Sequence, residues 1–158
     1  MASRLCLVLG GVRSGKSAFA EKKVVEFGQA TGSATLYVAT GVAIDDEMKD
    51  RIQRHQASRP SDWSTLEEPV LLVAKLTPLL EDSDAPGTVI IESVDVWVAN
   101  LLMDNQAEDK QSQEKTVTNE ADKLLRVVAG APQAFVLVSS EVGLSLVPPE
   151  PLGRRFQD

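Results

Sequence analysis

The sequence has little of several residue types, and each shortage excludes a class of protein. Its one cysteine, Cys6, has no second thiol for an internal disulfide, so the chain is not a disulfide-stabilised scaffold. No apolar run approaches the roughly 18 residues of a membrane-spanning helix, and the N-terminus lacks a signal-peptide pattern. With 16 basic against 23 acidic residues, the net charge of −7 leaves no broad basic face for nucleic acid. We expect a single cytoplasmic domain over residues 1–158 that binds any anionic ligand at a dedicated loop.

Short apolar segments alternate with helical patterns along the chain. Strands are predicted over 5–9, 35–40, 89–91 and 134–139, because nearly continuous apolar or β-branched runs are typical of strands buried on both faces. Helices are predicted over 16–27, ending at Gly28, and over 45–57, 69–81, 95–103 and 119–129. Residues 104–117 are almost devoid of apolar side chains and indicate a solvated loop or a polar helix extension. Strands alternating with helices predict an α/β fold.

A glycine-rich loop lies between the first predicted strand and the first predicted helix. It satisfies the pattern Gly-x-x-x-x-Gly-Lys-Ser in the strand–loop–helix context that a phosphate-binding loop requires. Its glycines let backbone N–H groups point at phosphates, Lys16 supplies a cation, and Ser17 can ligate Mg²⁺. The loop therefore predicts nucleotide binding within a three-layer, RecA-like P-loop NTPase domain with a mostly parallel central sheet. The predicted contacts are Gly10, Gly11, Val12, Arg13, Ser14, Gly15, Lys16 and Ser17.

A carboxylate, Glu92, ends the buried strand predicted over 89–91. A carboxylate at this place in a P-loop protein can hold Mg²⁺ directly or through water, so Glu92 is predicted to act with Ser17 at a metal site. A glutamate that simply emerges into solvent at the end of a strand is the alternative.

The one histidine of the chain, His55, falls within the helix predicted over 45–57. At 100° per residue, four side chains share one face within about 80°, with Arg51 beside them: Ile44, Met48, Ile52 and His55. The imidazole either packs against the core and bonds a backbone carbonyl, or faces the nucleotide and attacks phosphorus. The pattern alone does not choose between them.

Three acidic residues, Asp45, Asp46 and Glu47, stand at the start of the same helix. Acidic residues are favoured there because they cap backbone N–H groups and complement the helix dipole. A metal-binding cluster is the alternative, and we expect the capping role.

Several motifs recur in order along almost the whole chain. They are the P-loop GGVRSGKS, YVATG at 37–41, DDEM at 45–48, RIQRHQASRP at 51–60, Trp63, Glu67, Glu92, WVANLL at 97–102, SEVG at 140–143, and Val147 with Pro148. In these motifs the chain resembles the bifunctional adenosylcobinamide kinase / adenosylcobinamide-phosphate guanylyltransferase family of cobalamin biosynthesis.

The resemblance implies a two-step enzyme that uses Mg²⁺. Such an enzyme phosphorylates the aminopropanol hydroxyl of adenosylcobinamide with ATP or GTP, then transfers GMP from GTP to that phosphate, giving adenosylcobinamide-GDP. His55 matches the histidine that becomes guanylylated, and Lys16 is the second catalytic residue. The family also assembles as homo-trimers. Further nucleotide contacts carry over to Ala39, Thr40, Gly41, Gln56, Ala57, Ser58, Arg59, Glu67 and Glu92.

The sequence departs from the family pattern at two positions and at its end. Asp95 stands where the family usually has Thr, which adds negative charge near the phosphates, and Ser140 stands where it usually has Asn. Residues 149–156 predict the start of a helix, whereas the family continues through another helix and a final strand. We therefore expect those elements to be missing, with a sheet edge left unpaired or covered by a neighbouring subunit.

Two other functions stay open from the residues alone. One is a P-loop small-molecule kinase or NTPase in which His55 is structural, and the other is a nucleotide-binding form without activity. No motif identifies the corrinoid contacts or the nucleotide that serves the kinase step.

Overall fold

The computed structural model describes residues 4–158, apart from the side chains of Thr31, Arg51 and Ser58. Its centre is a five-stranded sheet in the order β1-β5-β4-β2-β3, with every neighbouring pair parallel. The strands are β1 (Leu5–Gly10), β2 (Thr35–Ala39), β3 (Ser64–Glu67), β4 (Thr88–Glu92) and β5 (Ala134–Ser140). The predicted α/β fold with a parallel sheet is confirmed.

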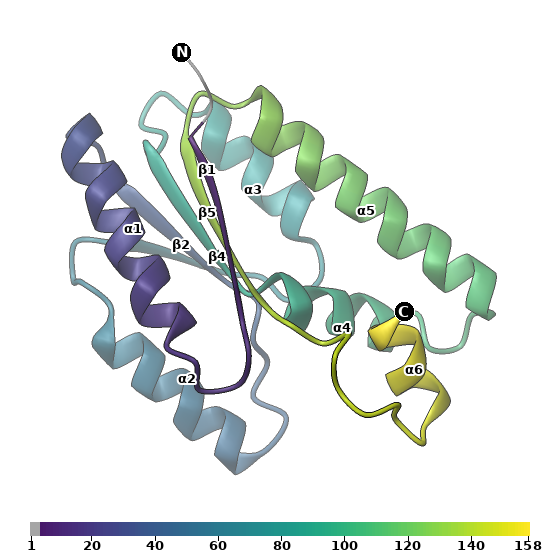
Figure 1. Cartoon of the computed structure of the whole chain (residues 1–158). Helices are drawn as coiled ribbons and strands as arrows, with labels where there is room; N and C mark the ends of the chain where they lie inside the picture. Colours follow the sequence, from purple (N-terminus) through teal and green to yellow (C-terminus); the bar gives the residue numbers. More distant parts are fainter. Residues whose placement is uncertain (1–3) are drawn as a thin grey trace.

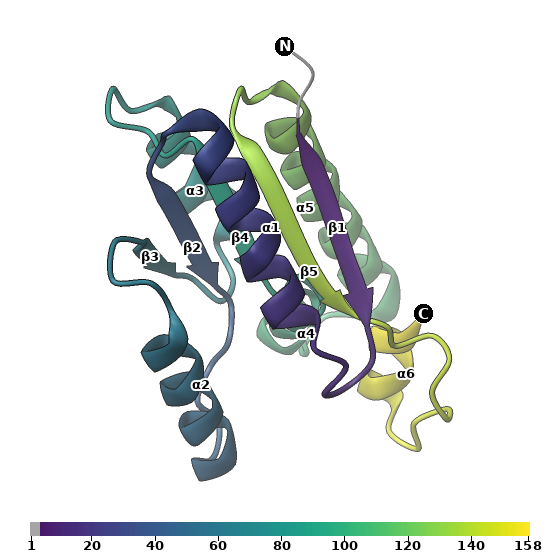
Figure 2. The same cartoon turned by 60° about the vertical axis from the view of Figure 1, so that its left-hand side comes forward.

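Helices cover both faces of the sheet and its carboxyl edge. They are α1 (Lys16–Thr31), α2 (Asp46–Ser58), α3 (Leu72–Glu81), α4 (Val94–Asp104), α5 (Lys110–Gly130) and α6 (Pro151–Gln157). Helix α1 lies on one face, α3 and α5 lie on the other, and α2, α4 and α6 gather at the end where the strands finish (Figures 1 and 2). Within residues 4–158, no helix is both long and apolar enough to cross a membrane.

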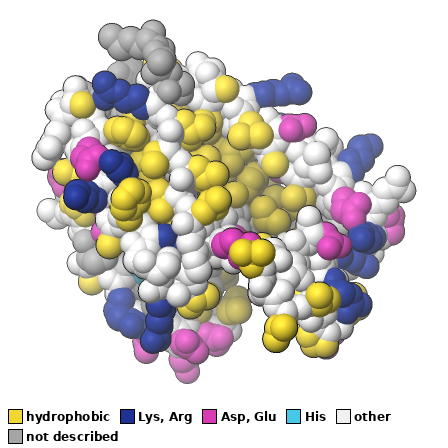
Figure 3. All heavy atoms as spheres, viewed as in Figure 1, with side chains coloured by type: hydrophobic (Ala, Val, Ile, Leu, Met, Phe, Trp, Pro, Cys, Tyr) yellow, Lys and Arg dark blue, Asp and Glu magenta, His cyan; other side chains and the backbone are white. Residues whose placement is uncertain are grey.

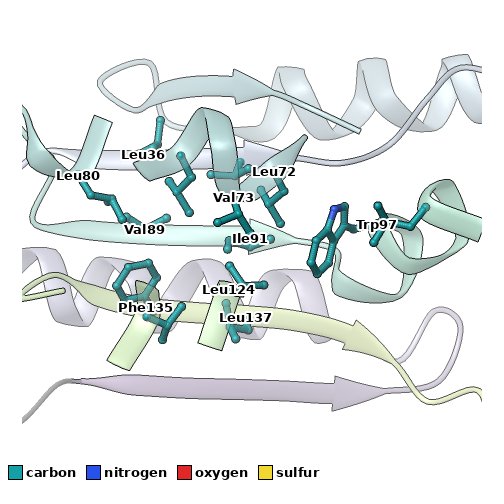
Figure 4. Close-up of a cluster of buried hydrophobic side chains, with 14 residues drawn as sticks. Leu36, Leu72, Val73, Leu80, Val89, Ile91, Trp97, Leu124, Phe135 and Leu137 are labelled. Carbon is teal, nitrogen blue, oxygen red and sulfur yellow. The ribbon is translucent and has the colours of Figure 1, made fainter. Parts of the chain in front are cut away.

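Two apolar cores sandwich the sheet, because successive side chains of a buried strand point to opposite faces. Ile90 packs toward α1 with Val24, whereas Val89 and Ile91 pack toward α3 and α5. Figure 4 shows the larger cluster, in which strand side chains meet Leu72 of α3, Trp97 of α4 and Leu124 of α5. These cores hold the carboxyl ends of the strands, and the loops that follow them, in fixed relative positions.

The predicted helix ends differ from the observed ones in α1. This helix passes through Gly28 and ends at Thr31, after which Gly32 adopts a left-handed φ of 63° and donates its N–H to the Gly28 carbonyl at 2.8 Å. Glycine takes that backbone conformation without steric cost, so Gly32 rather than Gly28 ends the helix.

Two further elements were incompletely predicted. Strand β3 was missed, because its four residues STLE are mainly exposed at the sheet edge and carry no apolar run. Helix α5 begins at Lys110, so most of the polar segment is helical; Asp109 caps it by accepting the Ser112 N–H at 3.0 Å. Its one deeply buried polar residue, Gln113, donates to the Asn105 carbonyl at 2.8 Å and accepts from Arg155 of α6 at 2.6 Å.

In the described part of the chain, β1 lies at one end of the strand order and pairs only with β5. Leu5, Leu7 and Leu9 are 51%, 55% and 60% exposed. Leu5 and Leu7 are in register with Phe135 and Leu137, so this row lies on the sheet face that α3 and α5 cover elsewhere. Figure 3 shows hydrophobic side chains gathered on that face.

Candidate functional site

The P-loop joins β1 to α1 with two residues in left-handed conformation, Arg13 at φ 55° and Gly15 at φ 84°. Gly15 immediately precedes α1, so the amino-terminal end of the helix points at the loop. Lys16 Nζ donates to the Gly11 carbonyl at 3.2 Å. The lysine and the helix dipole therefore bring positive charge to a loop of backbone N–H groups, as an anion site requires.

Close approach within the loop explains its first glycine. A Cβ added at Gly10 would lie 2.5 Å from Ser14 Oγ, a contact that real side chains do not make. The Gly10 carbonyl accepts the Glu141 N–H at 3.1 Å, so the loop is also fastened to the end of β5.

The two predicted metal ligands meet at the carboxyl end of β4. Ser17 Oγ donates to Glu92 Oε1, and the Tyr37 hydroxyl donates to Glu92 Oε2 at 2.6 Å. Mg²⁺ is commonly held by one carboxylate, a hydroxyl, waters and substrate phosphates, and Ser17 with Glu92 beside the P-loop fits this donor set. Within the described residues no cluster of three His, Cys, Asp or Glu side chains forms, so Asp45, Asp46 and Glu47 make no such metal cluster.

Glu92 is bonded to a buried tyrosine, whose ring contacts the half-buried Arg59 and Trp63. Burial, followed by the charge of Glu92 and the hydrogen bond to it, raises the pKa of the Tyr37 phenol. The Arg59 guanidinium carbon lies 3.7 Å from the centre of the Tyr37 ring, and Trp63 stacks on the same ring with centroids 6.4 Å apart. Arg59 Nε is buried with no hydrogen-bond partner among the described residues.

The charges of Glu92 and Arg59 also act on the pKa of Glu21 in α1. Burial raises the pKa of its carboxyl, the negative charge of Glu92 acts in the same direction, and Arg59 opposes both. The carboxylates and the guanidinium therefore share one electrostatic environment behind the P-loop.

Helix α2 carries His55 into the same region. Asp45 caps the helix by accepting the Met48 N–H at 2.7 Å, which agrees with the expected capping role. Met48, Ile52 and His55 line one cavity, and His55 is half-buried there. Ile44 was expected on this face but precedes the helix, is 68% exposed and does not line the cavity.

This first cavity measures about 300 Å³ and lies at the carboxyl edge of the sheet. Nine of the residues predicted from the sequence to bind nucleotide or to act in catalysis line it: Val12, Lys16, Ala39, Thr40, Gly41, His55, Arg59, Glu67 and Glu92. Phosphate-binding, imidazole and carboxylate groups that are far apart in the sequence therefore face one space.

The other predicted site residues lie outside the cavity lining. Gln56 donates to the lining residue Glu67 at 2.6 Å, and Ala57 is exposed. The side chains of Ser58 and Arg51 lie outside the described part of the structure. The remaining P-loop residues belong to the same loop or the first turn of α1 but do not line the cavity: Gly10, Gly11, Arg13, Ser14, Gly15 and Ser17.

The Ala39–Thr40–Gly41 turn is fixed by hydrogen bonds that the sequence did not reveal. Thr40 Oγ1 accepts the Ser93 N–H and donates to the Ser93 carbonyl, both at 2.8 Å. Asn100 of α4 donates to the Thr40 carbonyl, also at 2.8 Å. Buried polar residues of this kind carry no periodic sequence signal, although Asn100 belongs to one of the motifs that suggested the family.

The two positions that depart from the family pattern contact each other. Asp95 Oδ1 accepts the Ser140 backbone N–H at 2.9 Å, and both residues line the cavity with Lys16. The carboxylate therefore ties the start of α4 to the end of β5, and it adds negative charge beside the P-loop as expected.

Known proteins resemble this chain over nearly its whole length. Residues 6–158 match the family model described as cobinamide kinase / cobinamide phosphate guanyltransferase. The bifunctional adenosylcobalamin biosynthesis protein CobP of Pseudomonas aeruginosa is 39% identical over 152 residues, which cover 96% of this chain and 80% of that protein. The proteins called CobU of Escherichia coli and Salmonella typhimurium are 35% and 36% identical, covering 98% of this chain and 84% of each relative. The chain belongs to the cobinamide kinase / cobinamide phosphate guanyltransferase family.

Proposed function

We propose that this chain phosphorylates adenosylcobinamide and then transfers GMP from GTP to the new phosphate through a guanylylated His55. The observation that carries the proposal is a single cavity lined both by the P-loop lysine, Lys16, and by the imidazole of His55. A structural histidine would not need to face the phosphate-binding loop.

In the kinase step the P-loop and Lys16 hold the outer phosphates of the donor. The acceptor hydroxyl oxygen attacks the γ-phosphorus, the bond to the β,γ-bridging oxygen breaks, and the nucleoside diphosphate leaves while the hydroxyl proton is released. Lysine and backbone N–H groups stabilise charge on the transferred phosphoryl oxygens, because the transition state places most of its charge there.

In the guanylyltransfer step an imidazole nitrogen of His55 attacks the α-phosphorus of GTP. The bond to the α,β-bridging oxygen breaks, and pyrophosphate leaves toward the P-loop. An oxygen of adenosylcobinamide phosphate then attacks the same phosphorus, the P–N bond breaks, and adenosylcobinamide-GDP is released. Arg59 lines the same cavity, so its positive charge supports the negative charge that develops on the phosphate oxygens during both displacements.

Ser17 and Glu92 would hold Mg²⁺ together with the nucleotide. When bound, the ion neutralises charge on the leaving phosphates. The hydrogen bond from the Tyr37 hydroxyl fixes the orientation of the Glu92 carboxylate, whose oxygens would bind the ion.

The test is the intact mass of the protein after incubation with GTP and Mg²⁺. We expect the addition of one GMP moiety, labile to acid, in the wild type and none in His55→Gln. Two successive displacements also predict net retention of configuration when GTP chiral at the α-phosphorus is used. Absence of the adduct at saturating GTP would refute the covalent route, and phosphorylation of adenosylcobinamide without it would leave only a kinase.

A further inference from the structure

A second cavity adjoins the first on the other side of Asp95. It measures about 420 Å³ and lies between α4, α5 and α6. Asp95 and Ser140 line both cavities, so the two spaces meet at the hydrogen bond between α4 and the end of β5. A volume of this size is within the range of small-molecule sites, about 300–1,000 Å³.

The lining of the second cavity is mixed. One side is apolar and comes from α4, α5, α6 and the segment after β5: Val94, Val98, Leu102, Val117, Val142 and Phe156. The polar side includes Glu114 and Thr118, both exposed on α5. This combination suits an amphiphilic ligand whose carbon skeleton is buried and whose amides reach polar groups.

The relation of the two cavities to the P-loop suggests what enters each. His55 and Glu67 line only the first cavity, and Lys16 lines it from the P-loop side. A nucleotide with its outer phosphates on the P-loop and its α-phosphate near His55 fills that first space. A phosphoryl acceptor must reach the phosphates from a direction the nucleotide leaves open, and the second cavity opens toward them at Asp95.

We propose that the second cavity binds the amide-bearing side arm of the corrinoid acceptor, the arm that ends in the reacting hydroxyl. The inference rests on the function proposed above. A corrin macrocycle is far larger than this cavity, so the ring stays outside and only the arm enters. With its arm in this cavity, the acceptor can stay in one position for both the kinase step and the guanylyl transfer. After the nucleoside diphosphate has left, the new phosphate on the arm lies at the P-loop. This place is next to the first cavity, which holds guanylylated His55.

Thr118→Trp tests the assignment, because this exposed α5 residue lines the second cavity and a bulky ring there fills it from outside the core. Asn119→Trp is the matched control: the neighbouring exposed position lies about 100° around the helix and does not line the cavity. Binding of adenosylcobinamide is measured by equilibrium ultrafiltration, using the absorbance of the corrinoid. Guanylylation of His55 by GTP, which needs no acceptor, is measured on the same samples.

We expect Thr118→Trp to weaken adenosylcobinamide binding by about tenfold or more, since the loss of even small pocket contacts costs about 10–200-fold. Guanylylation should stay within about twofold of the wild type, and Asn119→Trp should change neither measurement. In the wild type, saturating adenosylcobinamide should slow amide exchange in α6, whereas GTP alone should not.

Unaltered acceptor affinity in Thr118→Trp, or no exchange protection of α6 at full occupancy, would overturn the proposal. A change in the solution mass of Thr118→Trp with unaltered acceptor binding would assign this surface to a contact between copies of the chain, and would overturn it as well. If the wild type does not form the GMP adduct, the result counts against the proposed function. If the wild type forms the adduct and Thr118→Trp binds adenosylcobinamide as the wild type does, the result counts against the acceptor site alone.

Discussion

Replacement of Tyr37 by phenylalanine removes one hydroxyl from the centre of the site and leaves the ring in place. Tyr37 is 2% exposed, and its hydroxyl donates to Glu92 Oε2 at 2.6 Å. The ring contacts with Arg59 and Trp63 do not involve the hydroxyl and are retained in the variant. The substitution therefore isolates a single hydrogen bond to a carboxylate.

The expected loss follows from the kind of bond removed. Hydrogen bonds to charged groups contribute about 1.5–3 kcal/mol, so Tyr37→Phe should lower the free energy of unfolding by about 2 kcal/mol. For a chain of this size each kcal/mol lowers Tm by about 2–4 °C, which gives a shift of roughly 4–8 °C. Urea denaturation followed by tryptophan fluorescence measures the free energy, and calorimetry measures the shift.

The pH dependence of stability gives a second readout. The folded protein holds the pKa of Tyr37 above its ordinary value, chiefly through burial and then through the charge of Glu92. Above pH about 10 the unfolded chain loses this proton while the folded protein keeps it, so the folded state becomes relatively less stable as pH rises. Above pH about 10 the free energy of unfolding of the wild type should therefore fall more steeply with pH than that of Tyr37→Phe. Near neutral pH the two slopes should be equal.

A double-mutant cycle with Glu92→Gln tests whether the loss of unfolding free energy in Tyr37→Phe comes from the hydrogen bond to the Glu92 carboxylate. In the Glu92→Gln background the bond joins two neutral groups, so losing the Tyr37 hydroxyl should cost only about 1 kcal/mol. A loss below about 0.5 kcal/mol in the wild-type background, or equal losses in both backgrounds, would refute the reasoning.

Three other substitutions test separate parts of the site. Gly10→Ala places a Cβ 2.5 Å from Ser14 Oγ, so either the Ser14 hydroxyl must rotate away or the loop must shift, and the nucleotide Kd measured by calorimetry should rise by on the order of tenfold. Asp95→Asn keeps an oxygen in the same position to accept the Ser140 N–H and removes a negative charge near the phosphates, so GTP should bind more tightly than in the wild type; weaker binding in Asp95→Asn would contradict this. Asp45→Ala removes the α2 cap and should lower stability by about 1 kcal/mol in urea denaturation, whereas an unchanged midpoint would show that the cap contributes nothing.

The strands and the P-loop could be predicted because their signals are local. Four of the five strands are short apolar runs, of which β2, β4 and β5 are buried on both faces, and the loop follows from glycine spacing between a strand and a helix. Strand β3 could not be predicted in this way, since its residues are stabilised by pairing with β2 at the sheet edge rather than by an apolar pattern of their own.

The parts of the site that the sequence did not predict depend on long-range pairing. Tyr37 and Glu92 are 55 residues apart, and Thr40 reaches Ser93 across 53 residues. Asp95 was noted only as a departure from the family, and its hydrogen bond to the backbone of Ser140 appears only when α4 and β5 are in place. Such contacts are set by the order of strands in the sheet, which no local pattern specifies.

The position of β1 couples nucleotide binding to the docking of this strand on β5. Among the described residues this strand pairs only with β5, and its last residue, Gly10, begins the predicted phosphate-binding loop. A chain whose β1 has detached loses the phosphate site, so a bound nucleotide stabilises the docked strand by RT ln(1 + [nucleotide]/Kd). Detachment exposes Val8, which is 6% exposed in the docked strand, beside Leu5, Leu7 and Leu9, which are already more than half exposed. Nucleotide binding and the docking of β1 therefore stabilise each other, and bound nucleotide should slow amide exchange in β1.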